Sequence, residues 1–199
     1  MRGLSKTVFV LGVVGVAVML ERLWAEWPGW APPDAQEQKA EVRLSIKVER
    51  AESGDYLQLQ VAFENVSEND TTLNLGMMLA NGKVHLPEAV RLVLTGADGK
   101  ARELHFGDHR YPGVAGRIDD YPVPLRAGSV YTLKLSLMDF WCAKEIMYER
   151  RLKPGKYCVR AAFRGSGPQH TAKDNLMFLY WWTGVVESEE VEFEVGKGS

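Results

Sequence analysis

The chain has 199 residues, of which 46% are hydrophobic and 25% charged, and its formal net charge is −2. This composition is typical of a globular protein and unlike that of a disordered one, and the length suits one domain behind a short N-terminal segment. The net charge is close to zero and the basic residues are scattered, so we expect no nucleic-acid partner.

An apolar run near the N-terminus predicts export. Arg2 and Lys6 precede an uninterrupted apolar stretch at residues 8–20. A basic segment followed by such a stretch matches a secretory signal peptide. No clean small-x-small cleavage site follows, so the alternative is a retained transmembrane helix with its N-terminus in the cytoplasm. We therefore expect a periplasmic or extracellular protein, secreted or anchored by a single N-terminal helix, with membrane contact only through residues 7–24.

The stretch after this run is a linker. It contains Pro28, Pro32 and Pro33 among polar residues and shows no apolar periodicity. The predicted organisation is a signal peptide or membrane anchor at 1–25, a Pro-rich linker at 26–40, and one domain at 41–196.

Alternating apolar residues predict a series of strands in the first half of the domain. Residues 42–48 and 57–63 alternate cleanly around a turn at 53–55, which predicts an antiparallel pair with one face in water. A third strand is expected at 73–77, with Leu73, Leu75 and Met77 along one face. Two further strands, at 90–94 and 104–106, flank Asp98-Gly99, a strong hairpin signal.

The second half of the domain is organised around residues 152–163. Pro154-Gly155 form a turn, and apolar residues then alternate from Tyr157 to Phe163. A Tyr at this place in a β-sandwich sends its hydroxyl back to upstream backbone. Further strands are expected at 131–137 and 191–195, with a short helix or crossover at 140–151, and residues 107–126 are expected to be irregular because of their Pro and Gly content. Together these patterns predict an all-β antiparallel sandwich.

Several of these motifs carry a resemblance to a known fold. Leu125-Arg-Ala-Gly128, the strand that follows it, Leu152-Lys-Pro-Gly-Lys-Tyr157 and the closing strand at 188–195 resemble the second half of an immunoglobulin-like module. Such modules are widespread in exported bacterial proteins. The resemblance implies an immunoglobulin-like β-sandwich behind an N-terminal hydrophobic helix, and a binding or structural role without catalysis or cofactor. The inter-sheet disulfide of antibody domains does not carry over, because no early strand contains a Cys.

Cys142 and Cys158 are the two cysteines of the chain. An even pair in an exported protein is more often bridged than free, so a Cys142–Cys158 disulfide is a candidate, and two buried thiols are the alternative. Neither Cys has the spacing of a zinc site or of a catalytic nucleophile.

Two groups of polar residues are candidates for a metal site. His105, Asp108 and His109 are close in sequence, with His85 and His170 elsewhere, but their spacing matches no metal motif. The carboxylates of Asp119, Asp120 and Asp139 are too few for a calcium loop. We expect no metal, no catalytic residues and no enzymatic activity.

The most suggestive residues for binding are Tyr180, Trp181 and Trp182. Neighbours in a strand point to opposite faces, so the two Trp side chains do not both enter the same core, and one aromatic ring is expected at the surface. The leading interpretation is a non-catalytic module that binds another protein at the cell envelope. The alternatives are a carbohydrate-binding module that uses these three rings and a protease inhibitor that presents the 107–126 loop.

Overall fold

The regular structure of the domain is almost entirely antiparallel β-strand, as the alternating apolar positions predict. The structure is a computed structural model that describes residues 42–50, 57–79, 82–96, 98–107, 117–145, 152–170 and 179–196. Within these ranges no helix is long and apolar enough to cross a bilayer. The expected N-terminal helix and the linker lie outside them.

The described residues form twelve strands and one short 3₁₀ helix. These are β1 (Val42–Arg50), β2 (Leu57–Asn65), β3 (Thr71–Leu79), β4 (Val84–Leu86), β5 (Val90–Thr95), β6 (Ala101–Phe106), β7 (Ile118–Leu125), β8 (Val130–Ser136), η1 (Leu137–Asp139), β9 (Phe140–Cys142), β10 (Gly155–Gly165), β11 (Gly184–Glu187) and β12 (Val191–Val195).

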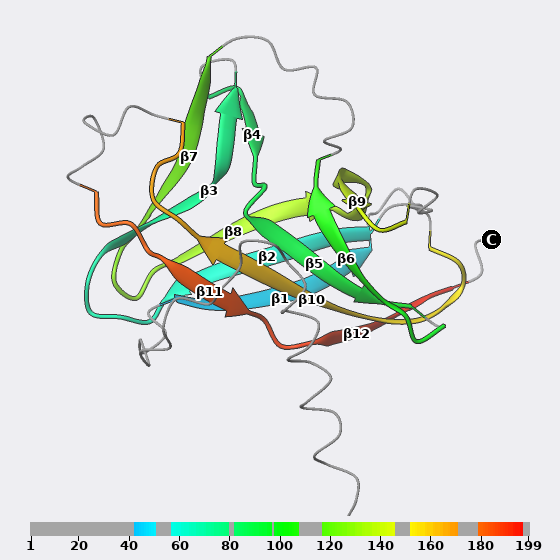
Figure 1. Cartoon of the computed structure of the whole chain (residues 1–199). Helices are drawn as coiled ribbons and strands as arrows, with labels where there is room; N and C mark the ends of the chain where they lie inside the picture. The colour runs from blue at the N-terminus through cyan, green and yellow to red at the C-terminus, as the bar shows by residue number, and fades with distance from the viewer. Residues whose placement is uncertain are drawn as a thin grey trace, which may run out of the picture. The chain divides into compact units, whose positions relative to one another are not determined.

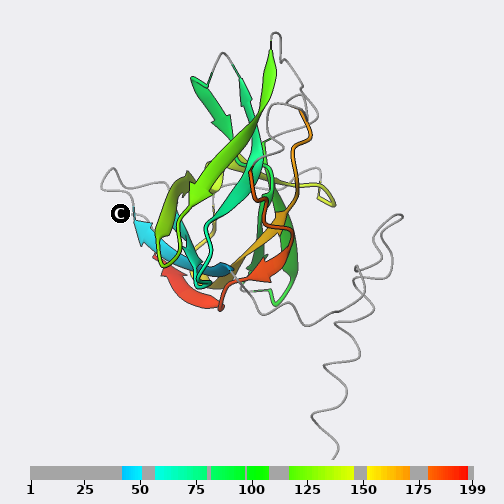
Figure 2. The same ribbon diagram turned by 90° about the vertical axis from the view of Figure 1, so that its left-hand side faces the viewer.

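The strands form three sheets around one core. One sheet has the order β1-β2-β8, a second has the order β11-β10-β5-β6-β9 with β12 also paired to β10, and a third has the order β4-β3-β7. The first sheet lies over the second, since β1 contacts β10, β11 and β12. The third sheet rises out of these two layers, as Figures 1 and 2 show from two directions.

Period-two alternation sets which side chains enter the core. In β1, Val42, Leu44 and Ile46 are buried, while Arg43 on the opposite face pairs with Glu64 across the strands at 3.1 Å. The buried side chains of all three sheets belong to a single hydrophobic cluster. The sequence prediction of amphipathic strands is therefore confirmed for this pair.

The predicted corner before β10 is also present. The hydroxyl of Tyr157 donates a hydrogen bond to the carbonyl of Lys153 at 2.8 Å, which is the upstream contact expected from the sequence. The Tyr157 ring is buried and stacks on Phe193 of β12, with 5.6 Å between the ring centroids. One side chain therefore fixes both the corner and the closing strand.

A buried serine joins β11 and β12 along the same side of β10. The backbone N–H of Ser188 donates to the carbonyl of Ala161, and the N–H of Ala161 donates to the Ser188 hydroxyl, both at 2.9 Å. The hydroxyl replaces the main-chain acceptor that is missing where the two strands meet. The sequence pattern identifies β12, but not the short β11 before it.

The third sheet differs most from the sequence prediction. Residues 118–125, expected to be irregular, form β7 and pair with β3, and β4 was not predicted. The sequence does not predict β7 because it contains Pro122 and Pro124, and proline is rare inside strands. The short helix of the second half lies at 137–139, just before the 140–151 stretch where a helix or crossover was expected.

Candidate functional site

The outer face of the β4-β3-β7 sheet carries an apolar patch. Leu79 lies directly opposite Val84 on one side and Ile118 on the other, and Met77 lies two residues further along β3. Directly opposite residues of antiparallel strands point to the same face. The exposed fractions of Val84 and Ile118 are 44% and 37%. We call Met77, Leu79, Val84 and Ile118 the outer apolar patch.

A β-bulge in β3 creates this patch. The pairing register of β3 with β7 shifts between Asn74 and Met77. Leu73 and Leu75, before the shift, are buried in the core. An extra residue in one strand reverses the side-chain alternation, so Met77 and Leu79 point away from the core face that Leu73 and Leu75 occupy. The prediction that Met77 shares a face with Leu73 and Leu75 is therefore wrong.

Gly76 makes the bulge sterically feasible. Its φ is +139°, a backbone conformation that residues with a Cβ rarely adopt, and an added Cβ would lie 2.7 Å from the backbone nitrogen of Glu88 and closer still to the carbonyl of Leu86. The strand can therefore approach the backbone that follows β4 only with glycine at this position.

The edge of this sheet that β7 forms is poorly suited to pairing with another strand. Thr72 of β3 faces Pro124 of β7, yet both its N–H and its carbonyl bond to the 180–182 segment. The Thr72–Pro124 pair is therefore one without mutual hydrogen bonds, and the nitrogen of Pro124 points to the outer edge, as does that of Pro122 two residues away. Neither proline has an N–H to offer there, which is a common way to protect an edge.

A buried polar network lies at the base of the same face. The carboxylate of Asp120 accepts hydrogen bonds from Nδ2 of Asn74 at 3.0 Å and from the backbone N–H groups of Gln169 and His170 at 2.8 and 3.1 Å. Nδ2 of Asn74 also donates to the carbonyl of Gly167 at 3.0 Å. This network holds the segment that follows β10 against the bulge, with Asp120 only 1% exposed.

Next to this network the surface opens into a cleft of about 480 Å³. Its walls come from the bulge of β3, the connection between β4 and β5, the start of β5, and the end of β10. The side chains that define its chemistry are Asn74, Glu88, Arg91, Arg164, Gln169 and His170. Arg91 is held by Glu103 at 2.9 Å. The two guanidinium groups outnumber the single carboxylate on these walls.

The predicted aromatic site does not form a platform of three rings. Tyr180 is 72% exposed, whereas Trp182 is 8% exposed and stacks on Phe163 in the core with 5.5 Å between centroids. Trp181 is half-buried and forms a parallel bridge with Thr72. As expected, the two Trp residues do not both enter the core. One aromatic ring is left at the surface.

The candidate disulfide between Cys142 and Cys158 is not formed, and both residues are free thiols. Cys142 lies on β9 and Cys158 on β10, with β6 and β5 between them, so three strand spacings of roughly 14 Å in total separate the two backbones. A disulfide requires Cα atoms within about 7 Å. Burial, followed by the carboxylates of Glu190 and Glu192, raises the pKa of the Cys158 thiol, which disfavours the reactive thiolate.

The candidate metal ligands are dispersed. Asp119 pairs with Arg117 at 2.9 Å, and Asp139 caps η1 by accepting from the N–H of Ser136 at 3.1 Å. His105 lies 3.8 Å from Glu103. Asp108 and His109 fall outside the described residues. Among the residues that the structure describes, no group of three or more His, Cys, Asp or Glu side chains is placed to hold a metal ion.

A tyrosine pair lies on the inner face of the third sheet. The hydroxyls of Tyr121 and Tyr131 are 2.6 Å apart, and the ring of His85 stacks on Tyr121 with 4.5 Å between centroids. Burial and the Tyr131 hydroxyl raise the pKa of Tyr121 well above its ordinary value. The pair joins β7 to β8 below the sheet.

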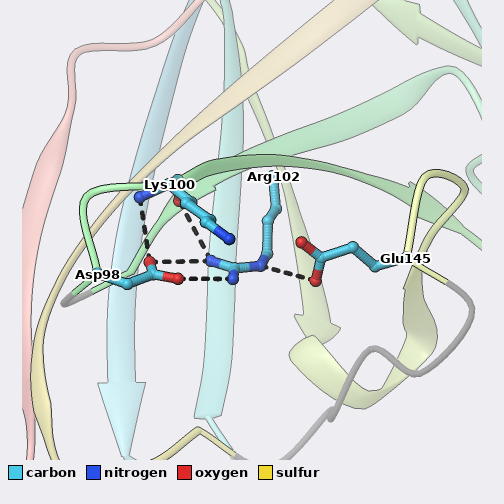
Figure 3. Close-up of polar contacts among 4 residues, drawn as sticks. All are labelled: Asp98, Lys100, Arg102 and Glu145. Carbon is cyan, nitrogen blue, oxygen red and sulfur yellow. Dashed lines mark hydrogen bonds and ion pairs between the residues drawn. The ribbon is translucent and has the colours of Figure 1, made fainter.

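A cluster of ionic contacts closes the predicted β5–β6 hairpin. The guanidinium of Arg102 donates to both carboxylate oxygens of Asp98 at 3.2 and 2.8 Å and to Glu145 at 3.0 Å (Figure 3). The hydrogen bond from Arg102 holds the pKa of Asp98 well below its usual range. Asp98 also accepts from the N–H of Lys100 at 3.0 Å. These contacts fasten the hairpin to the segment after β9.

The region proposed as an inhibitory loop is not one continuous loop. Residues 108–116 lie outside the described residues, and 118–125 form β7. The expectation of an irregular stretch over 107–126 is therefore wrong for its second half. Residues 118–125 therefore reach the surface as a strand paired with β3, and not as a loop.

Comparisons with known proteins give no family. No protein-family model matches the chain, and no curated protein matches it. One solved structure with some similarity is the X-ray structure of Northeast Structural Genomics Consortium target SoR45. The match has 12% sequence identity and a TM-score of 0.35, and covers 78% of this chain and 87% of that one. A likeness at this score carries no conclusion about fold or function.

Proposed function

We propose that the protein is a non-catalytic, exported binding module that contacts another protein at the cell envelope through the outer apolar patch. The observation that carries this proposal is the bulge at Gly76, which places Met77 and Leu79 on the outward face, with Leu79 between Val84 and Ile118. An outward strand face is ordinarily polar, as Thr72 and Asn74 are before the bulge. A contiguous apolar group on a raised sheet is typical of a protein-binding surface.

The finer fold assignment within this proposal is an immunoglobulin-like β-sandwich. Two antiparallel sheets that share one core support it, as does the hydrogen bond from Tyr157 to the backbone at the β10 corner. The apolar run at 8–20 supports export, with the N-terminal segment serving as a cleaved signal or as a single membrane anchor.

The use of polar groups supports a role without catalysis. Asp120 accepts three hydrogen bonds from within the fold, Asp119 pairs with an arginine, and Asp139 caps a helix. These carboxylates, singled out in the sequence for possible chemistry, therefore hold the fold together. A protein partner remains the proposed ligand, ahead of a glycan, because Trp182 belongs to the core.

The test is co-purification from the native host with quantitative mass spectrometry. Val84→Glu and Ile118→Glu each place a charge in the outer apolar patch. Val130→Glu, at a position on β8 that is 58% exposed, is the matched control. We expect at least one envelope protein to co-purify with wild type and the control but to be lost from both patch variants. If every co-purifying protein is retained equally by all three variants, the proposal is wrong.

A further inference from the structure

The outer apolar patch and the polar cleft form one continuous surface. Asp120 lies two residues along β7 from Ile118 and therefore on the same face. The N–H groups of Gln169 and His170 bond to its carboxylate, so the wall of the cleft begins where the patch ends. On the other strand, β4 leads directly into Glu88, which lines the cleft. The two features thus share both β3 and the β4 connection.

We propose that this surface binds an extended segment of a partner protein, with apolar side chains on the outer apolar patch and a carboxylate in the cleft. The inference rests on the proposed function and names the chemistry of the partner. From Leu79 back to Asn74 the strand advances by five residues, or about 16 Å at roughly 3.3 Å per residue, which an extended segment of about five residues matches. Alternate side chains of an extended segment point to the same side, so they can contact a sheet face together.

Charge at the cleft selects the carboxylate. Arg91 lies opposite Ala162, and Arg164 is two residues further along β10, so both side chains emerge on the same face of the six-stranded sheet. A guanidinium carries five N–H donors in a planar fork, so it can serve a carboxylate of its own chain and one of a ligand together. With His170 also among the lining residues, the cleft favours an acidic group over a basic one.

The experiment is selection of peptides from a random dodecapeptide display library on the purified full chain, followed by fluorescence anisotropy on the enriched sequences. We expect enriched peptides with alternating apolar residues followed by Asp, Glu or a free C-terminus. Arg164→Gln should weaken binding by at least about tenfold, the size of effect expected for a charge-assisted contact. Arg160→Gln is the control: Arg160 lies on the same strand and face but is not among the residues that line the cleft, so its replacement should leave affinity unchanged.

Replacing the acidic group of the peptide by its amide gives the second readout. The loss should match that of Arg164→Gln, and the two changes together should cost no more than either alone. The inference is overturned if no peptide is enriched, if enriched peptides lack an acidic group, or if both arginine variants act equally. It is also overturned if the protein binds phosphatidylglycerol vesicles and if Arg164→Gln, but not Arg160→Gln, loses that binding.

The outcomes separate this inference from the proposed function. If peptide binding depends on Val84 but not on Arg164 or an acidic group, the outer apolar patch is a protein-binding surface and the cleft is not part of it. If no selected peptide depends on the outer apolar patch, and no protein from the host depends on it either, both the proposed function and this inference are wrong. Equal thermal midpoints of all variants serve as the folding control.

Discussion

Asn65, at the end of β2, is a buried polar side chain that supports the base of the third sheet. It is fully buried, and its Nδ2 donates to the carbonyls of Asn69 at 2.8 Å and Leu125 at 3.0 Å. Its Oδ1 accepts from the N–H of Ser67 at 3.0 Å and from the Ser67 hydroxyl at 2.6 Å. The amide thus ties the end of β2 to the end of β7.

Asn65→Asp changes only the donor end of this group. It replaces two N–H donors by an oxygen that faces two carbonyls in a site without solvent. Each unsatisfied buried group costs about 1–3 kcal/mol, so we expect a loss of about 3–5 kcal/mol in the free energy of unfolding at pH 7. Burial among carbonyls should raise the pKa of the introduced carboxyl, so the deficit should shrink as the pH falls through that raised pKa.

The assay is equilibrium denaturation followed by tryptophan fluorescence at pH 7 and at lower pH. Asn69→Asp is the matched control, because it adds the same charge four residues away at an exposed side chain and should change stability by less than about 0.5 kcal/mol. A loss below about 1 kcal/mol for Asn65→Asp would refute the reasoning, as would a deficit that grows when the pH is lowered.

Three further predictions concern single side chains. Gly76→Ala should cost about 2–4 kcal/mol in denaturation experiments because its Cβ would collide with the backbone after β4, whereas Gly82→Ala, with a φ of +79° and open space around it, should cost about 1 kcal/mol. Equal costs would argue against the bulge. Tyr157→Phe should lose about 1–2 kcal/mol with its hydrogen bond to the corner, and an unchanged unfolding midpoint would show that the contact contributes nothing. Tyr121 stays protonated after unfolded tyrosines ionise, so stability should fall as the pH rises above about 10, and Tyr121→Phe should flatten this fall. An unaltered slope would contradict that assignment.

The sequence predicts the strands that have one apolar face and one polar face. Val42, Leu44 and Ile46 alternate with charged residues, and the Pro154-Gly155 corner identifies β10, because burial of one face leaves a period of two in the residues. The third sheet lacks this signal. Its β7 contains two prolines at positions where an edge strand needs no donor, and its β3 changes face at Gly76. A bulge reverses the pattern without altering composition.

The candidate site was missed for the same reason. In the sequence, Met77 and Leu79 continue the apolar alternation of β3, and only the register with β7 shows that they point outward. Val84 and Ile118 belong to strands that composition does not reveal. The sequence favours the aromatic residues instead, although Trp182 has the size and hydrophobicity of a core residue. A glycine between alternating apolar residues is the signal that points to the bulge.

Photo-crosslinking from neighbouring residues of β3 tests the central claim most directly. A small diazirine amino acid is placed at Met77, Met78 or Leu79, one position per variant, in cells of the native host. Met77 and Leu79 lie on the outward face, whereas Met78 packs against the core cluster. The account predicts the same protein adduct from 77 and 79 and none from 78. Adducts from 78 alone, or from none of the three positions, would contradict it.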